Sequence, residues 1–211
     1  MGKSMIGHNT SNRKIDTVIF DIGGVLAGYH TKDYFIGKGY SEETAERLQK
    51  ATMLSPYWKE YDRGVMKDEE IRGLFKQLEP ELAEEIDRSL TKMTGMITRR
   101  DASIPWIRDL QSRGLQVLVL SNFSDTAHRD NAGALDFLDV VDGGILSWKD
   151  KVIKPDPEIY ELLIARYHLN PERCVFIDDT EINLTAASAF GIHTILYRTE
   201  EQVKSELEKL I

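Results

Sequence analysis

Short apolar runs recur through most of the chain and are separated by longer segments with a different period. Four of them, Ile15–Phe20, Gln116–Leu120, Cys174–Ile177 and His193–Tyr197, are rich in aliphatic and β-branched residues. Runs of this length and content predict buried strands. A further short strand, broken by a pair of glycines, is expected within Val140–Leu146.

The segments between these runs carry apolar residues at helical spacing. The predicted helices are Pro105–Arg113, Ser124–Asn131, Pro157–His168, Glu181–Phe190 and Glu200–Leu210. Strands that alternate with helices in this way predict parallel βαβ units. We therefore expect an α/β fold built on a doubly wound, Rossmann-like parallel sheet.

One block, from Thr31 to Arg99, lacks strand signals and has helical patterns throughout. It contains a capping serine, Ser41, before an acidic first turn, and further helical patterns begin near Lys67 and Pro80. Such a block predicts a compact helical insertion. The expected segments are a flexible leader over 1–14, a Rossmann-like core over 15–30 and 100–211, and an all-helical cap over 31–99.

Composition and charge narrow the class of protein. With 41% hydrophobic and 29% charged residues, the 211-residue chain can bury an ordinary core, and its net charge of −8 argues against a broad nucleic-acid surface. No apolar run approaches the ~20 residues of a membrane helix. The single cysteine, Cys174, falls in a predicted strand, which fits a core residue in a reducing compartment. We expect a cytoplasmic monomer or weak homodimer that binds neither nucleic acid nor membrane.

Polar residues follow three of the predicted strands. Asp21 ends the first, Ser121 and Asn122 follow the QVLVL run, and Asp178 and Asp179 follow the CVFI run. The carboxyl ends of parallel strands lie along one edge of a sheet, where open α/β folds bind ligands. These side chains are therefore expected to converge.

Two further features are typical of a phosphate site. Gly23 and Gly24 follow Asp21 and predict a tight turn whose backbone can approach a ligand. Lys154, in the segment IKPD, supplies a cation between the glycine-broken strand and the next helix. Carboxylates of this kind hold Mg²⁺, whose remaining positions go to water and substrate phosphate. The sequence thus predicts a small-molecule site with Mg²⁺ as cofactor.

The motifs FDIGGVL, LSN, IKPD and FIDD, in this order, resemble those of the haloacid dehalogenase superfamily. The resemblance extends from about Ile15 onward and includes a helical C1-type cap after the first motif. Within that superfamily the chain is similar to sugar-1-phosphate phosphatases and to the phosphatase domain of soluble epoxide hydrolases. It implies a hydrolase that acts on phosphomonoesters.

The resemblance also implies roles for individual residues. Asp21 matches the nucleophile that forms an aspartyl-phosphate, and Lys154 matches the lysine that balances charge on nucleophile and phosphoryl group. Ser121, Asn122 and Gly24 match the phosphate-binding positions.

The implied magnesium ligands are Asp21, the backbone carbonyl of Gly23, Asp179 and, directly or through another group, Asp178. Asn183, one turn after Asp179, is expected to orient this site.

Gly23 departs from the family pattern, because most phosphatases of the superfamily carry there an Asp that protonates the leaving alcohol. Loss of a general acid costs about 10²–10⁴-fold in rate. The chain is therefore expected to turn over ordinary alkyl phosphates slowly and to favour easier leaving groups, such as an anomeric sugar oxygen.

Three functions remain open at this stage. The preferred one is a Mg²⁺-dependent phosphatase of a small phosphorylated metabolite, with sugar phosphates among the candidates. The others are a haloacid dehalogenase or phosphonatase-type hydrolase, and a catalytically silent binding module. Lys151 competes with Lys154 as the site lysine. Cap residues near the hinge that could face the site are His30, Trp58, Lys59, Tyr61 and Arg63.

Overall fold

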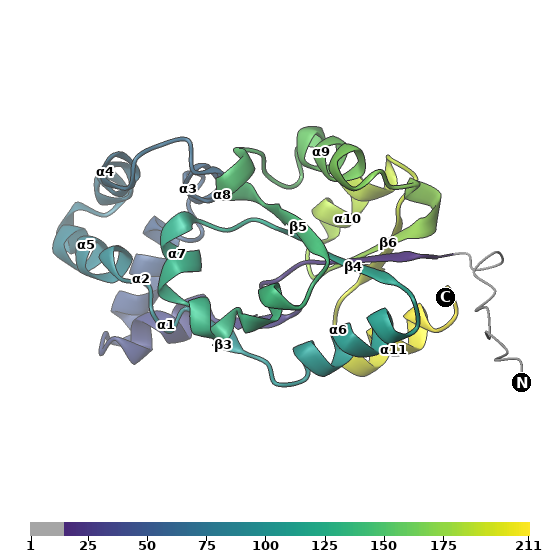
Figure 1. The fold of residues 1–211 in the computed structure, drawn as a ribbon. Helices are drawn as coiled ribbons and strands as arrows, with labels where there is room; N and C mark the ends of the chain where they lie inside the picture. Colours follow the sequence, from purple (N-terminus) through teal and green to yellow (C-terminus); the bar gives the residue numbers. More distant parts are fainter. Residues whose placement is uncertain (1–14) are drawn as a thin grey trace, which may run out of the picture.

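A five-stranded parallel sheet forms the centre of the computed structural model, which describes residues 15–211 (Figure 1). Its strand order is β5-β4-β1-β6-β7. The strands are β1 (Thr17–Phe20), β4 (Gln116–Ser121), β5 (Gly143–Leu146), β6 (Cys174–Asp178) and β7 (His193–Leu196). The expected α/β fold with a doubly wound parallel sheet is confirmed, and the leader over 1–14 lies outside the described residues.

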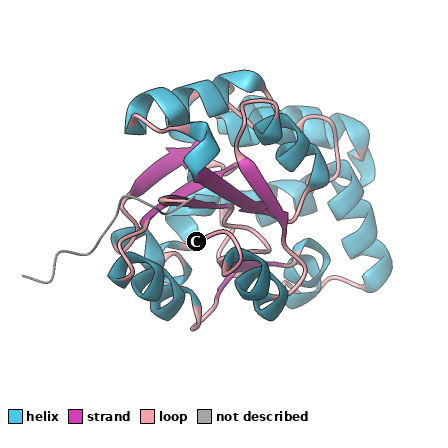
Figure 2. Ribbon diagram, turned by 90° about the vertical axis from the view of Figure 1, so that its right-hand side faces the viewer, coloured by secondary structure: helices cyan, strands magenta, loops and turns pink. Residues whose placement is uncertain are grey.

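Helices cover both faces of this sheet, as Figure 2 shows. The core helices are α6 (Ser103–Ser112), α7 (Asp125–Asp130), α8 (Ser147–Asp150), α9 (Pro157–Tyr167), α10 (Glu181–Ser188) and α11 (Glu200–Leu207). Short 3₁₀ turns occur at Ala132–Ala134, Asp136–Asp139 and Pro171–Arg173.

Strand β1 is buried on both faces because it lies in the middle of the sheet. Val18 and Phe20 pack into the cluster that includes α6 and α11, whereas Ile19 packs into the cluster that includes α9 and α10. The alternation follows from the two-residue period of a strand. Cys174 is buried at the start of the neighbouring β6, as expected.

The cap helices lie at one end of the molecule, beside the strand ends (Figure 1). They are α1 (Thr31–Gly37), α2 (Glu42–Ala51), α3 (Trp58–Arg63), α4 (Asp68–Leu78) and α5 (Ala83–Thr91), with a 3₁₀ turn at Pro80–Leu82. Ser41 caps α2 as the sequence predicts, since its side chain accepts a hydrogen bond from the Thr44 backbone N–H at 3.2 Å.

A small antiparallel sheet joins the cap to the core. It pairs β2 (Ala27–Tyr29) with β3 (Ile97–Arg99), so the far end of the block expected to be all-helical is a strand. The strand was missed because it is three residues long and its partner lies about seventy positions earlier in the chain. A Cβ atom on Gly28 would lie 2.2 Å from Thr98 Oγ1, so the close pairing requires glycine there.

The glycine pair expected to break a strand lies inside β5 instead. Gly143 and Gly144 pair with Leu118 and Val119 of β4. A Cβ atom on Gly144 would lie 2.2 Å from the Val119 carbonyl oxygen. On the other side, the Tyr167 hydroxyl accepts a hydrogen bond from the Gly144 N–H at 2.6 Å. The glycines therefore permit close packing within the strand.

Within residues 15–211, none of the helices combines the length and apolar character needed to cross a membrane.

Candidate active site

The polar residues at the ends of β1, β4 and β6 meet, as the strand order requires. Asp21, Ser121 and Asp179 line one cavity of about 340 Å³, and Lys154 lines it from the segment between α8 and α9. Ser121 is buried, and its hydroxyl lies within hydrogen-bonding reach of the Asp21 carboxylate. Gly23, at the turn after β1, also lines the cavity.

Lys154 is the central cation of this site. Its side chain is buried, and Nζ lies 2.8 Å from Asp21 Oδ1 and 2.7 Å from Asp178 Oδ2. Burial by itself lowers the pKa of this ammonium group. The two carboxylates raise the pKa by more than burial lowers it, so the net shift is upward. Lys154 therefore stays charged. Lys151, by contrast, is exposed and donates to the Gly64 carbonyl oxygen at 2.6 Å, so the structure selects Lys154.

Asp178 holds Lys154 in place. Its carboxylate accepts hydrogen bonds from the Lys154 ammonium group, from the Thr180 N–H at 2.7 Å and from the Asn183 amide at 3.1 and 3.3 Å. Asn183 is buried and thus orients Asp178, consistent with the orienting role expected for it. With its oxygens engaged, Asp178 positions the lysine, and Asp21 and Asp179 remain to receive a cation.

Asn122 fixes the backbone of Lys154, a role that the sequence did not suggest. Its side-chain Nδ2 donates to the Lys154 carbonyl oxygen at 2.9 Å, and its Oδ1 accepts from the Lys154 N–H at 2.8 Å. The two bonded residues are 32 positions apart in the sequence, so no local sequence pattern predicts the contact.

The pKa of the Asp21 carboxyl group is raised by its surroundings. Desolvation raises its pKa to about 6, against the opposing effect of the nearby Lys154 charge. Asp178 adds to the upward shift, and the Ser121 hydroxyl opposes it. The Asp21 carboxylate is thus desolvated and paired with a cation.

The carboxylates present fit a magnesium ion. Asp21, Asp178 and Asp179 each offer an oxygen, and these atoms lie within 4.8 Å of one another. An all-oxygen donor set is what Mg²⁺ requires. The turn after β1 is shaped for the same cluster, because a Cβ atom on Gly24 would lie 2.2 Å from Asp179 Oδ2. Asp21 and Asp179, with the Gly23 carbonyl expected to join them, would hold the ion.

Replacing Gly24 by Ala should weaken magnesium binding. Gly24 has φ of +77°, which costs an L-residue about 1–2 kcal/mol, and the new methyl group would displace the Asp179 carboxylate. Calorimetric titration with Mg²⁺ should show a roughly tenfold or larger loss of affinity, since a ligand is moved. Gly73→Ala is the matched control, because no atom lies within 4 Å of its added Cβ atom. Unchanged affinity in Gly24→Ala would contradict the assignment of Asp179.

The cap closes the cavity with only one of the residues predicted for that role. Trp58 of α3 lines the cavity. Arg63 instead forms an ion pair with Asp156 of the core at 2.8 Å, and Tyr61 is buried in the cap with its hydroxyl 3.7 Å from Met93 Sδ. Lys59 and His30 are exposed and are not among the residues that line the cavity.

Asp62 of α3 also lines the cavity, although sequence reasoning did not select it. It lies four residues after Trp58 and hence on the same face of the helix. The four-residue spacing from Trp58 is the one sequence signal that places Asp62 toward the cavity. Other acidic residues of the cap lie on solvated faces, and this spacing alone does not separate Asp62 from them.

A parallel α/β core with a carboxylate and lysine cluster at its strand ends is the architecture of a Rossmann-like hydrolase. The chain belongs to the haloacid dehalogenase-like hydrolase family, whose model matches residues 15–191.

Three curated proteins illustrate the range of its relatives. Mouse (Mus musculus) acyl-CoA dehydrogenase family member 10 is 27% identical over 224 residues, covering 96% of this chain and 20% of that protein. Bifunctional epoxide hydrolase 2 of Sus scrofa is 32% identical over 111 residues, and the match covers 48% of this chain and 19% of that protein. The phosphorylated carbohydrates phosphatase of Thermotoga maritima is 24% identical over 189 residues, and the match covers 86% of this chain and 84% of that protein. The chain therefore spans about a fifth of the length of the first two.

Solved structures show the same fold. The HAD family enzyme bt-2542 of Bacteroides thetaiotaomicron, in complex with magnesium and inorganic phosphate, superposes with a TM-score of 0.64. It is 20% identical, and the match covers 88% of this chain and 96% of that chain.

Proposed function

We propose that this chain is a Mg²⁺-dependent phosphatase that hydrolyses a small phosphomonoester through an aspartyl-phosphate on Asp21. The observation that carries the proposal is the contact of Asp21 with the buried Lys154, 2.8 Å away, within a cavity that Ser121 and Asp179 also line. A carboxylate nucleophile, a fixed cation and a metal-binding pair of carboxylates are the parts that phosphoryl transfer needs.

The reaction has two displacements at phosphorus. An Asp21 oxygen forms a bond to phosphorus while the bond to the leaving oxygen breaks, and water then displaces the phosphoryl group from Asp21. Lys154 neutralises charge on the nucleophile and the phosphoryl oxygens, and the Ser121 hydroxyl and the backbone of Asn122 and Gly24 bind those oxygens. A bound magnesium ion would reduce the repulsion between the two anions.

The lining of the cavity supports a substrate with one phosphate and a compact organic group that has some apolar surface. Met53, Trp58 and Met96 contribute apolar surface from the cap side, and Phe123 contributes it from the core. Among the described residues, Lys154 is the one lysine or arginine in the lining, which disfavours a second phosphate.

A substrate panel tests the proposal and its alternatives. Purified protein with Mg²⁺ should release phosphate from small phosphomonoesters, and a chelator should reduce the rate to background because the Asp21–Asp179 site is then empty. Restoring Mg²⁺ after chelation is the control for damage by the chelator. Halide release from 2-haloacids without phosphate release would favour the dehalogenase alternative. Inactivity on every substrate class would favour a silent module.

Gly23 bears on the rate rather than on the class of reaction. If no other acid serves the leaving group, alkyl phosphates should be hydrolysed slowly, by about 10²–10⁴-fold relative to an enzyme that has one. Whether alkyl phosphates are hydrolysed slowly therefore depends on every residue that lines the cavity, because any element of the lining can supply a proton donor.

A further inference from the structure

One carboxyl group of the cavity has no part in the mechanism above. Asp62 belongs to the cap helix α3, whereas the carboxylates Asp21, Asp178 and Asp179 belong to the core. It lines the same cavity as Asp21 and Lys154 and is half-buried there. The cap thus adds one carboxyl group to a cavity whose other carboxyl groups come from the core.

Three polar contacts hold this part of the cap on the core. The buried Ser147 hydroxyl donates to the Asp62 carbonyl oxygen at 2.6 Å and accepts from the Phe123 N–H at 2.8 Å. Arg63, the next residue, pairs with Asp156 at 2.8 Å. Lys151 reaches the Gly64 carbonyl oxygen at 2.6 Å. The backbone at Asp62 is therefore fixed relative to the strand ends.

The surroundings of the Asp62 carboxyl group favour its protonated form. Desolvation and the nearby Asp21 charge raise its pKa to about 8, and Lys154 partly opposes the rise. The Ser124 N–H and the Trp58 side chain donate toward it and also lower the pKa, but by less. Tyr29, the other titratable group beside it, is neutral because burial raises its own pKa.

The position at which the family usually carries its proton donor has room but no side chain. Gly23 lines the cavity, and a Cβ atom added there would meet Tyr29 Cβ at 3.6 Å, an ordinary contact. Its φ lies outside the left-handed region, unlike that of Gly24 at +77°. Neither crowding nor backbone conformation therefore requires glycine at this position.

We propose that Asp62 of the cap is the general acid of this enzyme and takes the place left by Gly23. The proposal rests on the phosphatase function proposed above. It makes the cap a contributor to the chemistry as well as a cover for the cavity, because the acid is present only while α3 is docked on the core.

The proton balance closes over the two displacements. As Asp21 forms its bond to phosphorus, the Asp62 carboxylic acid gives its proton to the departing oxygen, which leaves as the neutral alcohol. Asp62 is then a carboxylate beside the aspartyl-phosphate. It accepts a proton from the attacking water, whose oxygen bonds to phosphorus and releases Asp21. The cycle ends with Asp62 protonated and inorganic phosphate formed.

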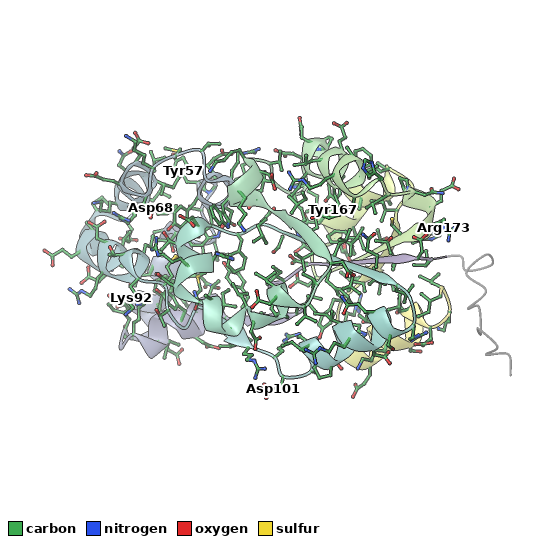
Figure 3. The ribbon with its side chains drawn as sticks, viewed as in Figure 1. Tyr57, Asp68, Lys92, Asp101, Tyr167 and Arg173 are labelled. Atoms are coloured by element: carbon green, nitrogen blue, oxygen red, sulfur yellow. The ribbon has the colours of Figure 1, made fainter. Side chains whose placement is uncertain are left out.

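Asp62→Asn, assayed on two esters, tests the role. An alkyl phosphate needs the proton, whereas p-nitrophenyl phosphate has a leaving group stable without it. We expect kcat/KM with the alkyl phosphate to fall about 10²–10⁴-fold and kcat/KM with the aryl ester to change little, because kcat/KM reports the steps up to departure of the alcohol. Hydrolysis of the aspartyl-phosphate, in which Asp62 accepts a proton from water, is common to both esters and enters kcat alone. For wild type, kcat/KM with the alkyl ester should decline as pH rises through about 8, where Asp62 ionises. Asp68→Asn, on cap helix α4 with a hydrogen bond to core Thr126, controls for cap docking (Asp68 is labelled in Figure 3).

A second variant separates chemistry from structure. Gly23→Asp in the Asp62→Asn background places an acid at the position the family uses, and it should restore turnover of the alkyl ester. An equal loss of kcat/KM on both esters, or no loss on either, would overturn the role of Asp62 as general acid. If wild type releases phosphate from neither ester, the proposed function fails, and the role of Asp62 fails with it.

Thermal unfolding gives a readout that is independent of turnover. The pKa of Asp62 is raised in the folded state, so ionisation opposes folding, and the cost grows as pH rises from about 4 to about 8. Asp62→Asn removes that cost. The Tm of the variant should therefore exceed that of wild type by a margin that widens between pH 5 and pH 9. A margin that stays constant with pH would contradict the protonated state required of the acid.

Discussion

Asp21→Asn should abolish phosphate release, with kcat reduced by on the order of 10⁴–10⁶-fold, as expected when a covalent nucleophile is removed. An amide neither attacks phosphorus nor binds a magnesium ion as a carboxylate does. The variant also loses the charge that faces Lys154 at 2.8 Å. Steady-state phosphate release measures the rate, and mass spectrometry of acid-quenched wild type should find the phosphoryl group on the peptide that contains Asp21.

The loss in Asp21→Asn should not come from unfolding. Desolvation raises the pKa of Asp21 to about 6 in the folded state, so its ionisation opposes folding at neutral pH. The neutral asparagine should leave Tm at pH 7 unchanged or higher, the usual relation between stability and function at an active site. Asp16→Asn, at the opposite end of the same strand and paired with Arg173 at 2.8 Å, is the matched control. Phosphate release at the wild-type rate by Asp21→Asn would refute covalent catalysis by this residue.

The convergence of the core residues was predictable because it depends on topology alone. Once the apolar runs are assigned to a parallel sheet, the residues at the carboxyl ends of β1, β4 and β6 must share an edge. Asp21, Ser121 and Asp178 follow directly from that rule. Lys154 required a further step, because it lies on a segment between helices and competed with Lys151 until the structure placed Lys151 at the surface.

The residues that sequence reasoning missed depend on packing between distant segments. Asn122 holds the Lys154 backbone across 32 positions, a contact without a local pattern. Asp62 lines the cavity from α3, which is held on the core by the contact of Ser147 with the Asp62 carbonyl oxygen and by the Arg63–Asp156 ion pair. Helical periodicity shows that Asp62 and Trp58 lie on the same face of α3. It does not show the angle at which the cap docks on the core.

Cap and core are therefore coupled in this site. The core contributes carboxylates from strand ends whose geometry the sheet enforces and a lysine from the segment between α8 and α9, whereas the cap contributes apolar walls and a carboxyl group from a helix held by a few polar contacts. Such contacts open more readily than a sheet does. If Asp62 acts as proposed, variation in the cap changes the substrate and the source of the proton while the core chemistry stays the same.

Lys154→Met should give the largest loss of stability among these variants, about 3–5 kcal/mol at pH 7. Methionine fills a similar volume, but it leaves Asp21 and Asp178 buried and facing each other without the cation that lies 2.8 and 2.7 Å from them. Denaturant unfolding measures the loss, and Lys151→Met is the control, since an exposed lysine contributes at most about 1 kcal/mol.

The pH dependence of Lys154→Met distinguishes loss of charge balance from loss of packing. Without the ammonium group the pKa of Asp21, already about 6 in wild type, should rise further, so the folded variant binds protons that wild type does not. The stability deficit should therefore shrink as pH falls from 7 toward 5, where one carboxyl group becomes neutral. Activity should not return with stability, because the protonated Asp21 is no nucleophile. A deficit that is independent of pH would show that Lys154 acts through packing, and it would remove the electrostatic basis of the site.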